Sequence, residues 1–183
     1  MFNVDNVRTA KILGSAISDA QVVKGMVITR GAEGTIKKVL KAKVACYADG
    51  ITTAKTDAKG TVYIEKAAEL EGYAKTEEDA MEAKIKEIAD AGVTLVVVGG
   101  TVHEMAMHFL ERYKIMIVKT PSKFELRRVC QAVKAEPLVR IAAPSPEQTG
   151  YVDECIVEEI GSTQCTIFKQ VKEDSAIATI VLR

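Results

Sequence analysis

Two successive strand–helix patterns in the second half of the chain constrain the fold more than any other feature. Residues 94–98 form an apolar run of strand length, and residues 102–113 carry apolar side chains at helical spacing. The same order repeats at residues 115–119 and 122–133, where Ser122 occupies the position of a helix N-cap. Successive units of this kind place their strands in parallel, with helices packed on the sheet. The sequence therefore predicts an α/β fold.

Further strands are expected on both sides of this region. Extended segments are predicted at residues 8–13, 21–28, 43–47, 166–170 and 176–182. Residues 48–59 have no clear period and are expected to form a long excursion, whereas Pro137, Pro144 and Pro146 mark an extended connection. A chain of 183 residues with 48% apolar side chains fills one core, so a single domain is expected.

Helical patterns also occupy the region before the first buried strand. Residues 67–73 suggest a short helix, and the motif Thr76-Glu-Glu-Asp79 has the form of a capped start to a second one. Met81, Ile85 and Ile88 follow at four- and three-residue spacing, which places one apolar stripe on this second helix. Gly92 is the expected stop signal.

Charge and cysteine usage exclude several classes of protein. Lys and Arg together number 25, as do Asp and Glu, so there is no basic excess to attract nucleic acid. This balance conceals local blocks, because residues 65–91 hold 9 acids and 4 bases whereas residues 114–140 hold 7 bases and 2 acids. No apolar run has the length of a membrane span, and the N-terminus lacks a signal-peptide layout. Four cysteines without a C-x-x-C pair indicate reduced thiols, and hence a cytoplasmic location rather than a zinc ribbon or disulfide scaffold.

Motifs for metal or nucleotide chemistry are weak. His103 and His108 are five residues apart, so on a helix their side chains diverge by about 140° and no metal site is predicted. Gly99-Gly100 lies between a strand and a helix but lacks the rest of a phosphate-binding motif. No catalytic residue is predicted. The alternative that stays open is a small α/β enzyme or module that binds a phosphorylated ligand near Gly99-Gly100 and Arg127-Arg128.

The helices at residues 102–113 and 122–133 are both amphipathic. In the first, the apolar face predicted to pack on the sheet comprises Val102, Met105, Ala106, Phe109 and Tyr113. Its outward side comprises His103, Glu104, Met107, His108, Glu111 and Arg112. A flexible methionine among polar groups suits varied partners, although the same pattern fits an ordinary solvated face. In the second helix, the residues predicted to lie near the core are Phe124, Leu126, Val129 and Val133.

The order and spacing of several motifs resemble the apical domain of a group II chaperonin subunit over nearly the whole chain. The matching segments are Lys11-Ile-Leu-Gly14, Val23-Lys-Gly-Met-Val27, Gly60-Thr-Val62, Ile88-Ala-Asp90, Met105-Ala-Met-His108, Ser122-Lys-Phe-Glu-Leu-Arg-Arg-Val-Cys130, Thr163-Gln164, Phe168-Lys169, Lys172-Glu-Asp174 and Ala178-Thr-Ile-Val-Leu-Arg183. The resemblance implies β/β/α layers in one apical domain, residues 1–183, with a helical protrusion at about residues 49–80. It also implies a piece of a larger subunit of an ATP-driven ring.

What the resemblance implies about function is recognition of unfolded or partly folded polypeptide clients, with the protrusion contributing to a built-in lid. ATP and Mg²⁺ would belong to an equatorial domain, whose G-D-G-T-T element is absent from this sequence, so no ATPase activity and no cofactor are expected here. The expected partners are clients and neighbouring subunits of a hetero-oligomeric double ring, with no nucleic acid and no membrane. The implied client-binding residues are the outward helix residues named above together with Arg30, Thr35, Ile36 and Lys37 of a facing loop, residues 30–38.

Overall fold

The computed structural model describes residues 4–14, 16–52, 67–171 and 177–183. Its α-helices are α1 (Ala67–Asp90), α2 (Glu104–Arg112) and α3 (Lys123–Val133), and short 3-10 helices cover Val4–Asn6 and Ile17–Asp19. The strands are β1 (Val7–Lys11), β2 (Gln21–Ile28), β3 (Lys38–Tyr47), β4 (Leu95–Val98), β5 (Met116–Lys119), β6 (Pro137–Leu138), β7 (Gly150–Ile160), β8 (Thr163–Lys169) and β9 (Ala178–Leu182).

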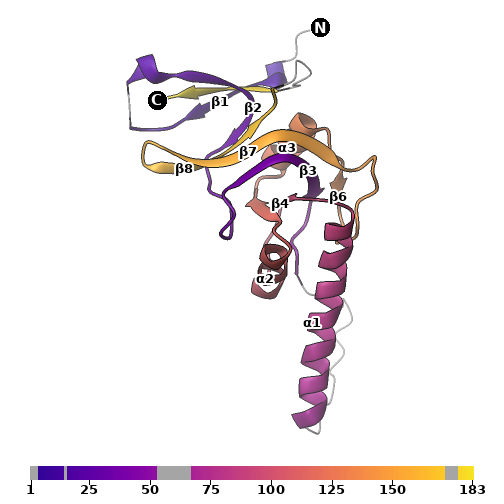
Figure 1. Ribbon diagram of the computed structural model, residues 1–183. Helices are drawn as coiled ribbons and strands as arrows, with labels where there is room; N and C mark the ends of the chain where they lie inside the picture. The colour runs from indigo at the N-terminus through magenta and orange to yellow at the C-terminus, as the bar shows by residue number, and fades with distance from the viewer. Residues whose placement is uncertain (1–3, 15, 53–66, 172–176) are drawn as a thin grey trace.

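One mixed sheet runs through the domain in the order β1-β9-β2-β8-β7-β3-β4-β5, with β6 paired to β3. β3, β4 and β5 are parallel neighbours, and Leu95 lies opposite Met116 in the register of β4 and β5. The predicted α/β class and its parallel strand pair are therefore confirmed. In Figure 1, β1, β2 and the C-terminus lie at one end of the domain, whereas α1 and α2 lie at the other.

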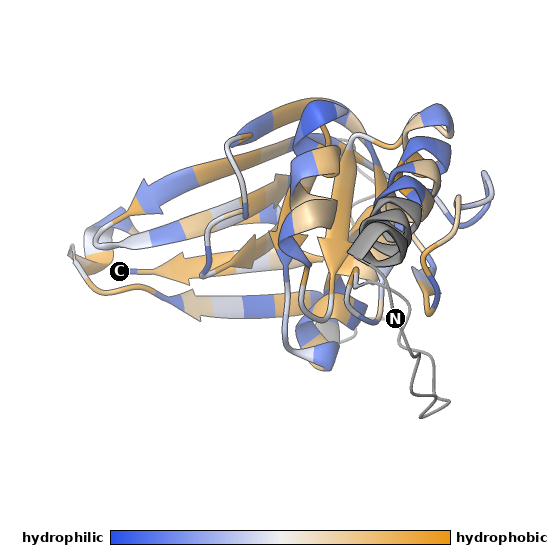
Figure 2. Cartoon of the chain, turned by 90° about the horizontal axis from the view of Figure 1, so that it is seen from below, coloured by the Kyte–Doolittle hydropathy of each residue, from blue (hydrophilic) through white to orange (hydrophobic). Residues whose placement is uncertain are grey.

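The parallel strands are covered by helices on both faces, which explains why their sequences are almost continuously apolar. Alternate side chains of β3 divide between two buried clusters: Val44 and Cys46 belong to the cluster under α3, and Ala45 and Tyr47 belong to the cluster under α1 and α2. Figure 2 shows these strands as mostly hydrophobic, whereas hydrophilic and hydrophobic residues alternate along the helices. α2 and α3 thus lie on opposite faces of the sheet.

α1 is one continuous helix, so the predicted break before Thr76 is wrong. A capping motif in mid-chain marks a helix start only if the preceding segment is not helical, and one glycine such as Gly72 costs a helix only about 1 kcal/mol. The predicted stripe is confirmed, because Met81, Ile85 and Ile88 are all buried. So is the stop at Gly92, which has a φ of 79°. The N-terminal part of α1 extends well beyond the body of the domain (Figure 1).

β7 is a long strand that the sequence pattern did not predict. Its burial does not alternate regularly, because Val152 and Cys155 are both buried although they are three residues apart. Glu154 forms ion pairs with Lys38 of β3 at 2.9 Å and Lys169 of β8 at 3.6 Å, and the hydrogen bond from Lys38 is the main cause that lowers the pKa of this carboxyl group. Glu154, one of the charged residues that make this strand hard to recognise in the sequence, is therefore paired with both neighbouring strands.

Candidate functional site

The N-terminus of α2 is held by His103. The Nδ1 atom of His103 accepts a hydrogen bond from the backbone N–H of Met105 at 3.4 Å. The backbone N–H of His103 donates to the carbonyl oxygen of Ile51 at 2.8 Å. α2 accordingly begins at Glu104 and not at Val102, whose backbone bridges to Ile51. His103 and Glu104 remain exposed, as the sequence predicted for outward residues.

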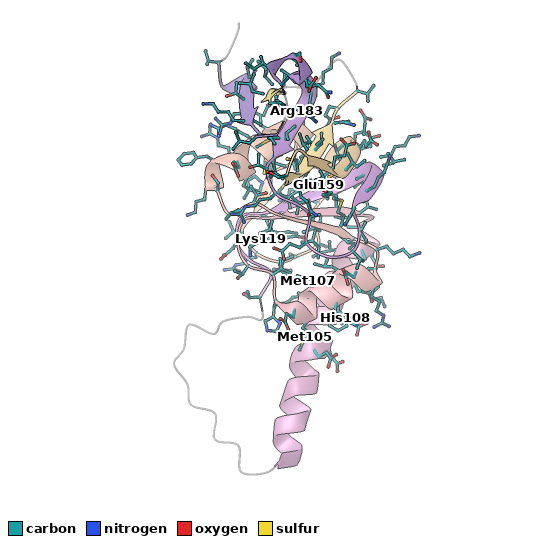
Figure 3. All side chains as sticks on the ribbon, turned by 90° about the vertical axis from the view of Figure 1, so that its left-hand side faces the viewer. Met105, Met107, His108, Lys119, Glu159 and Arg183 are labelled. Atoms are coloured by element: carbon teal, nitrogen blue, oxygen red, sulfur yellow. The ribbon has the colours of Figure 1, made fainter. Side chains whose placement is uncertain are left out.

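Met107 lies differently from the prediction. It is half-buried and packs against the cluster under α1 and α2, whereas the neighbouring His108 is exposed and stacks edge-on against Phe109 with ring centroids 5.6 Å apart. Figure 3 shows Met105, Met107 and His108 near the base of the projecting helix, far from Arg183. The outward side of α2 thus presents mainly polar groups.

Glu111 and Arg112 tie α2 to two other segments. The Oε1 atom of Glu111 accepts a hydrogen bond from the backbone N–H of Thr35 at 2.7 Å, and the Nη1 atom of Arg112 pairs with the Oε1 atom of Glu82 on α1 at 3.0 Å. The Tyr113 hydroxyl lies 3.4 Å from the same Glu82 oxygen. Both predicted site residues therefore have structural partners within the domain.

The predicted loop at residues 30–38 joins β2 to β3 and is held at several points. The carbonyl oxygen of Arg30 accepts a hydrogen bond from Thr166 Oγ1 at 2.7 Å, and that of Lys37 accepts one from the Val157 N–H at 2.8 Å. Ile36 is half-buried against the cluster under α3. The side chains of Arg30, Thr35 and Lys37 are exposed. The structure thus brings Thr35 to α2, whereas Arg30 and Ile36 are held by other parts of the domain.

A pocket of about 510 Å³ lies beside α3, on the opposite face of the sheet from α2. It is lined by Ala48, Asp49, Lys123, Leu126, Arg127, Pro137 and Val139. β6 forms one side because Pro137 and Leu138 pair with the end of β3, so the predicted extended connection contains a short strand. The sequence indicated the helix and the prolines separately but not that they enclose a pocket.

Phe124 and Val139 add exposed apolar surface at this side of the domain, each with 74% of its area accessible. The prediction that Phe124 lies near the core is wrong. Leu126, Val129 and Val133 are buried as predicted, and Phe124 precedes Leu126 by two positions, or about 200° around a helix. The helical period alone was therefore enough to place Phe124 outward.

The pocket carries more positive than negative charge. Lys123 and Arg127 are exposed, and within the described chain neither forms an ion pair. Among the described lining residues, Asp49 carries the one carboxylate, and its Oδ1 accepts a hydrogen bond from the Gly50 N–H at 2.8 Å. Two cations and one carboxylate thus surround a mainly apolar floor.

Gly99-Gly100 has a packing role. A Cβ atom on Gly99 would clash with the carbonyl oxygen of Ala48, and one on Gly100 would lie 2.8 Å from the Cα of Gly50. The backbone that follows β3 therefore lies directly against this glycine pair. Close backbone approach explains this glycine pair without a bound nucleotide.

The four cysteines are buried and unlinked. Desolvation raises the pKa of Cys155 to about 12, and a hydrogen bond with Cys130 is the main cause that raises the pKa of Cys46 well above its usual value. The same hydrogen bond lowers the pKa of Cys130. Over the described ranges, no cluster of three or more His, Cys, Asp or Glu side chains is placed to hold a metal ion. Nor do the described helices include one long and apolar enough to cross a membrane.

Comparison with known proteins relates this architecture to one family. The model of the TCP-1/cpn60 chaperonin family matches residues 1–183. The T-complex protein 1 subunit theta of Dictyostelium discoideum is 52% identical over 182 residues, that of Arabidopsis thaliana 50% and that of Homo sapiens 47%; each match covers 100% of this chain. These matches cover 34%, 33% and 33% of the relatives, so the chain spans about a third of their length.

A solved structure shares the fold. The open-state monomer of a group II chaperonin from Methanococcoides burtonii matches with a TM-score of 0.73 and 16% identity, covering 98% of this chain and 39% of that chain. The sequence motifs resemble the theta subunit in particular, and the theta relatives confirm that resemblance. The chain belongs to the TCP-1/cpn60 chaperonin family.

Proposed function

We propose that this chain recognises unfolded or partly folded polypeptides as the apical domain of an ATP-driven chaperonin subunit. The observation that supports this most is the pocket beside α3, whose mainly apolar lining includes the exposed Val139, while the exposed Phe124 lies on the same helix as the lining residues Lys123 and Arg127. Exposed apolar surface beside a concave site is typical of surfaces that bind other polypeptides. Membership of a chaperonin family supports the same function. Unfolded chains expose apolar side chains, which such a surface would cover.

The outward residues of α2 and the loop at residues 30–38 form a second proposed contact surface. Its members are His103, Glu104, Met107, His108, Glu111, Arg112, Arg30, Thr35, Ile36 and Lys37. The bond between Thr35 and Glu111 holds the loop and the helix together, so a client segment would meet both at once. Because several of these side chains also serve the fold, we assign the main contact to the α3 side.

The proposed parent of this domain is a larger subunit that binds ATP. ATP and Mg²⁺ would bind in an equatorial domain, and hydrolysis there would move the apical domain as a hinged unit. Its neighbours would be the other subunits of a hetero-oligomeric double ring in the cytoplasm. The proposed protrusion, about residues 49–80, would contribute to the lid; residues 53–66 of it lie outside the described residues. The extension of α1 beyond the body of the domain supports this role (Figure 1).

Binding of a permanently unfolded protein tests the proposal. The 183-residue chain is titrated into a fluorescently labelled protein that has been reduced and carbamidomethylated so that it cannot refold, and anisotropy reports binding. We expect the Val139→Asp variant to weaken binding about tenfold, because a buried carboxylate in the contact must be desolvated. Val22→Asp is the matched control, since Val22 is 69% exposed on β2, away from the pocket.

Two outcomes would contradict the proposed function. The first is an absence of client binding by a chain whose circular dichroism and thermal transition show that it is folded. The second is tight binding of ATP or another phosphorylated ligand without client binding, which would favour the alternative of a phosphate-binding α/β module. Equal losses in the two aspartate variants would remove the assignment to the α3 pocket.

A further inference from the structure

We propose that the pocket beside α3 selects client segments in which an apolar side chain is flanked by carboxylates. This inference rests on the proposed function and names the class of polypeptide that the same site would prefer. The apolar part of the match comes from Leu126, Pro137 and Val139. A volume of about 510 Å³ lies within the range of sites that enclose small ligands, and it accommodates a large side chain of an extended segment.

Lys123 and Arg127 are the residues that would bind the carboxylates of such a segment. They stand four residues apart on α3, so they lie on the same face of the helix, and both line the pocket. Like charges at this spacing repel each other, and within the described chain no acidic side chain pairs with either. A carboxylate from a bound segment would relieve that repulsion.

The position of Lys123 also favours binding of a negatively charged group. It is the first residue of α3, where the helix dipole favours negative charge and disfavours a lysine. Asp49 does not supply the missing charge, because its Oδ1 is engaged with the Gly50 N–H and no ion pair within 4.0 Å links it to Lys123 or Arg127. The two cations are therefore available to a partner.

Charge distribution over the domain favours the same class of segment. Residues 114–140, which include α3, hold 7 bases and 2 acids, whereas residues 65–91, which include α1 on the opposite face of the sheet, hold 9 acids and 4 bases. An acidic segment is thus attracted to the α3 side and repelled from α1. The separate basic and acidic regions therefore allow a chain of zero net charge to prefer acidic over basic client segments.

Short unstructured peptides isolate the two requirements. The probes are fluorescein-labelled Gly/Ser peptides with one central triplet, Asp-Phe-Asp, Asn-Phe-Asn, Lys-Phe-Lys or Asp-Ser-Asp, titrated with the 183-residue chain at 50 and 300 mM salt. We expect Asp-Phe-Asp to bind about three- to tenfold more tightly than Asn-Phe-Asn, and Lys-Phe-Lys to bind most weakly. The advantage of Asp-Phe-Asp should shrink at 300 mM salt.

Charge variants test the assigned residues. Arg127→Glu should abolish or reverse the preference for Asp-Phe-Asp, and the milder Arg127→Gln should reduce it, so the test survives if the charge reversal impairs folding. Lys86→Glu is the matched control, because Lys86 is exposed on α1 and gives the same change in net charge. It should leave the preference unchanged.

Several results would overturn the inference. Equal affinity for the acidic and basic peptides would do so, as would an Arg127→Glu variant that keeps the wild-type preference. Equal binding of Asp-Ser-Asp and Asp-Phe-Asp, with both displaced by inorganic phosphate, would make the pocket a simple anion site. If the peptides show no selectivity but the unfolded protein still binds, and Val139→Asp weakens that binding, only the preference for acidic segments is contradicted. If the unfolded protein does not bind either, the proposed function is contradicted as well.

Discussion

The backbone N–H of Thr35 donates a hydrogen bond of 2.7 Å to the Oε1 atom of Glu111, joining the loop after β2 to α2 across 76 positions in the sequence. Gly34, with a φ of 84°, allows this approach, because a side chain there would press against the same carboxylate. The loop and the helix therefore behave as one surface.

Glu111→Gln should loosen this loop. The amide cannot replace the charge of the carboxylate, so we expect a loss of about 1 kcal/mol in the free energy of unfolding and faster hydrogen exchange at the Thr35 amide. Urea denaturation and exchange measured by mass spectrometry check both effects. Glu104→Gln, on the exposed first turn of the same helix, is the control. Unchanged exchange at Thr35 would show that the bond does not hold the loop in solution.

Arg112→Ala tests whether α2 contacts clients. The substitution removes an outward side chain and also its ion pair with Glu82, so Glu82→Ala is the matched control that breaks the same pair. If the α2 surface contributes, Arg112→Ala weakens binding of the unfolded protein about two- to threefold and Glu82→Ala does not. Anisotropy titration distinguishes them. Unchanged binding in both Arg112→Ala and Met107→Ala would remove α2 from the proposed contact.

Phe124 and Leu126 should respond oppositely to truncation. Phe124→Ser removes a side chain that is 74% exposed, so stability should change by less than about 0.5 kcal/mol while client binding weakens. Leu126→Ala opens a cavity in the core and should cost about 2–4 kcal/mol. Thermal and urea denaturation measure the difference. A large loss of stability in Phe124→Ser would contradict the outward position of this ring.

Alkaline pH should destabilise the domain through Cys155. Burial raises the pKa of this thiol from 9.0 to about 12, so the unfolded chain releases its proton first. The stabilising effect is complete below pH 9 and is lost as the pH rises from 9 towards 12; between pH 8 and 10 this thiol alone removes about 1.4 kcal/mol. Urea denaturation at the two pH values should show a smaller loss for Cys155→Ala than for the wild type. The same loss in both proteins would exclude Cys155 as a cause.

The sequence by itself determined the elements whose signals are local. Ser122 begins α3 by accepting a hydrogen bond from the Glu125 N–H, and Gly92 ends α1, because caps and stop signals act within a few residues. The buried runs of β4 and β5 were readable for a related reason: strands covered on both faces are apolar throughout. The family resemblance followed from the order of such segments.

Only the tertiary structure decided which distant residues meet. β7 was missed because it carries several charged side chains, and the strands that supply lysines to pair with Glu154 and Glu158 lie elsewhere in the sequence. The pocket beside α3 needs α3, β6 and the end of β3 at once, and no local pattern records that meeting. Periodicity assigns a residue to one side of its own helix, whereas packing between elements determines whether that side is covered, as Met107 shows by its half-buried position.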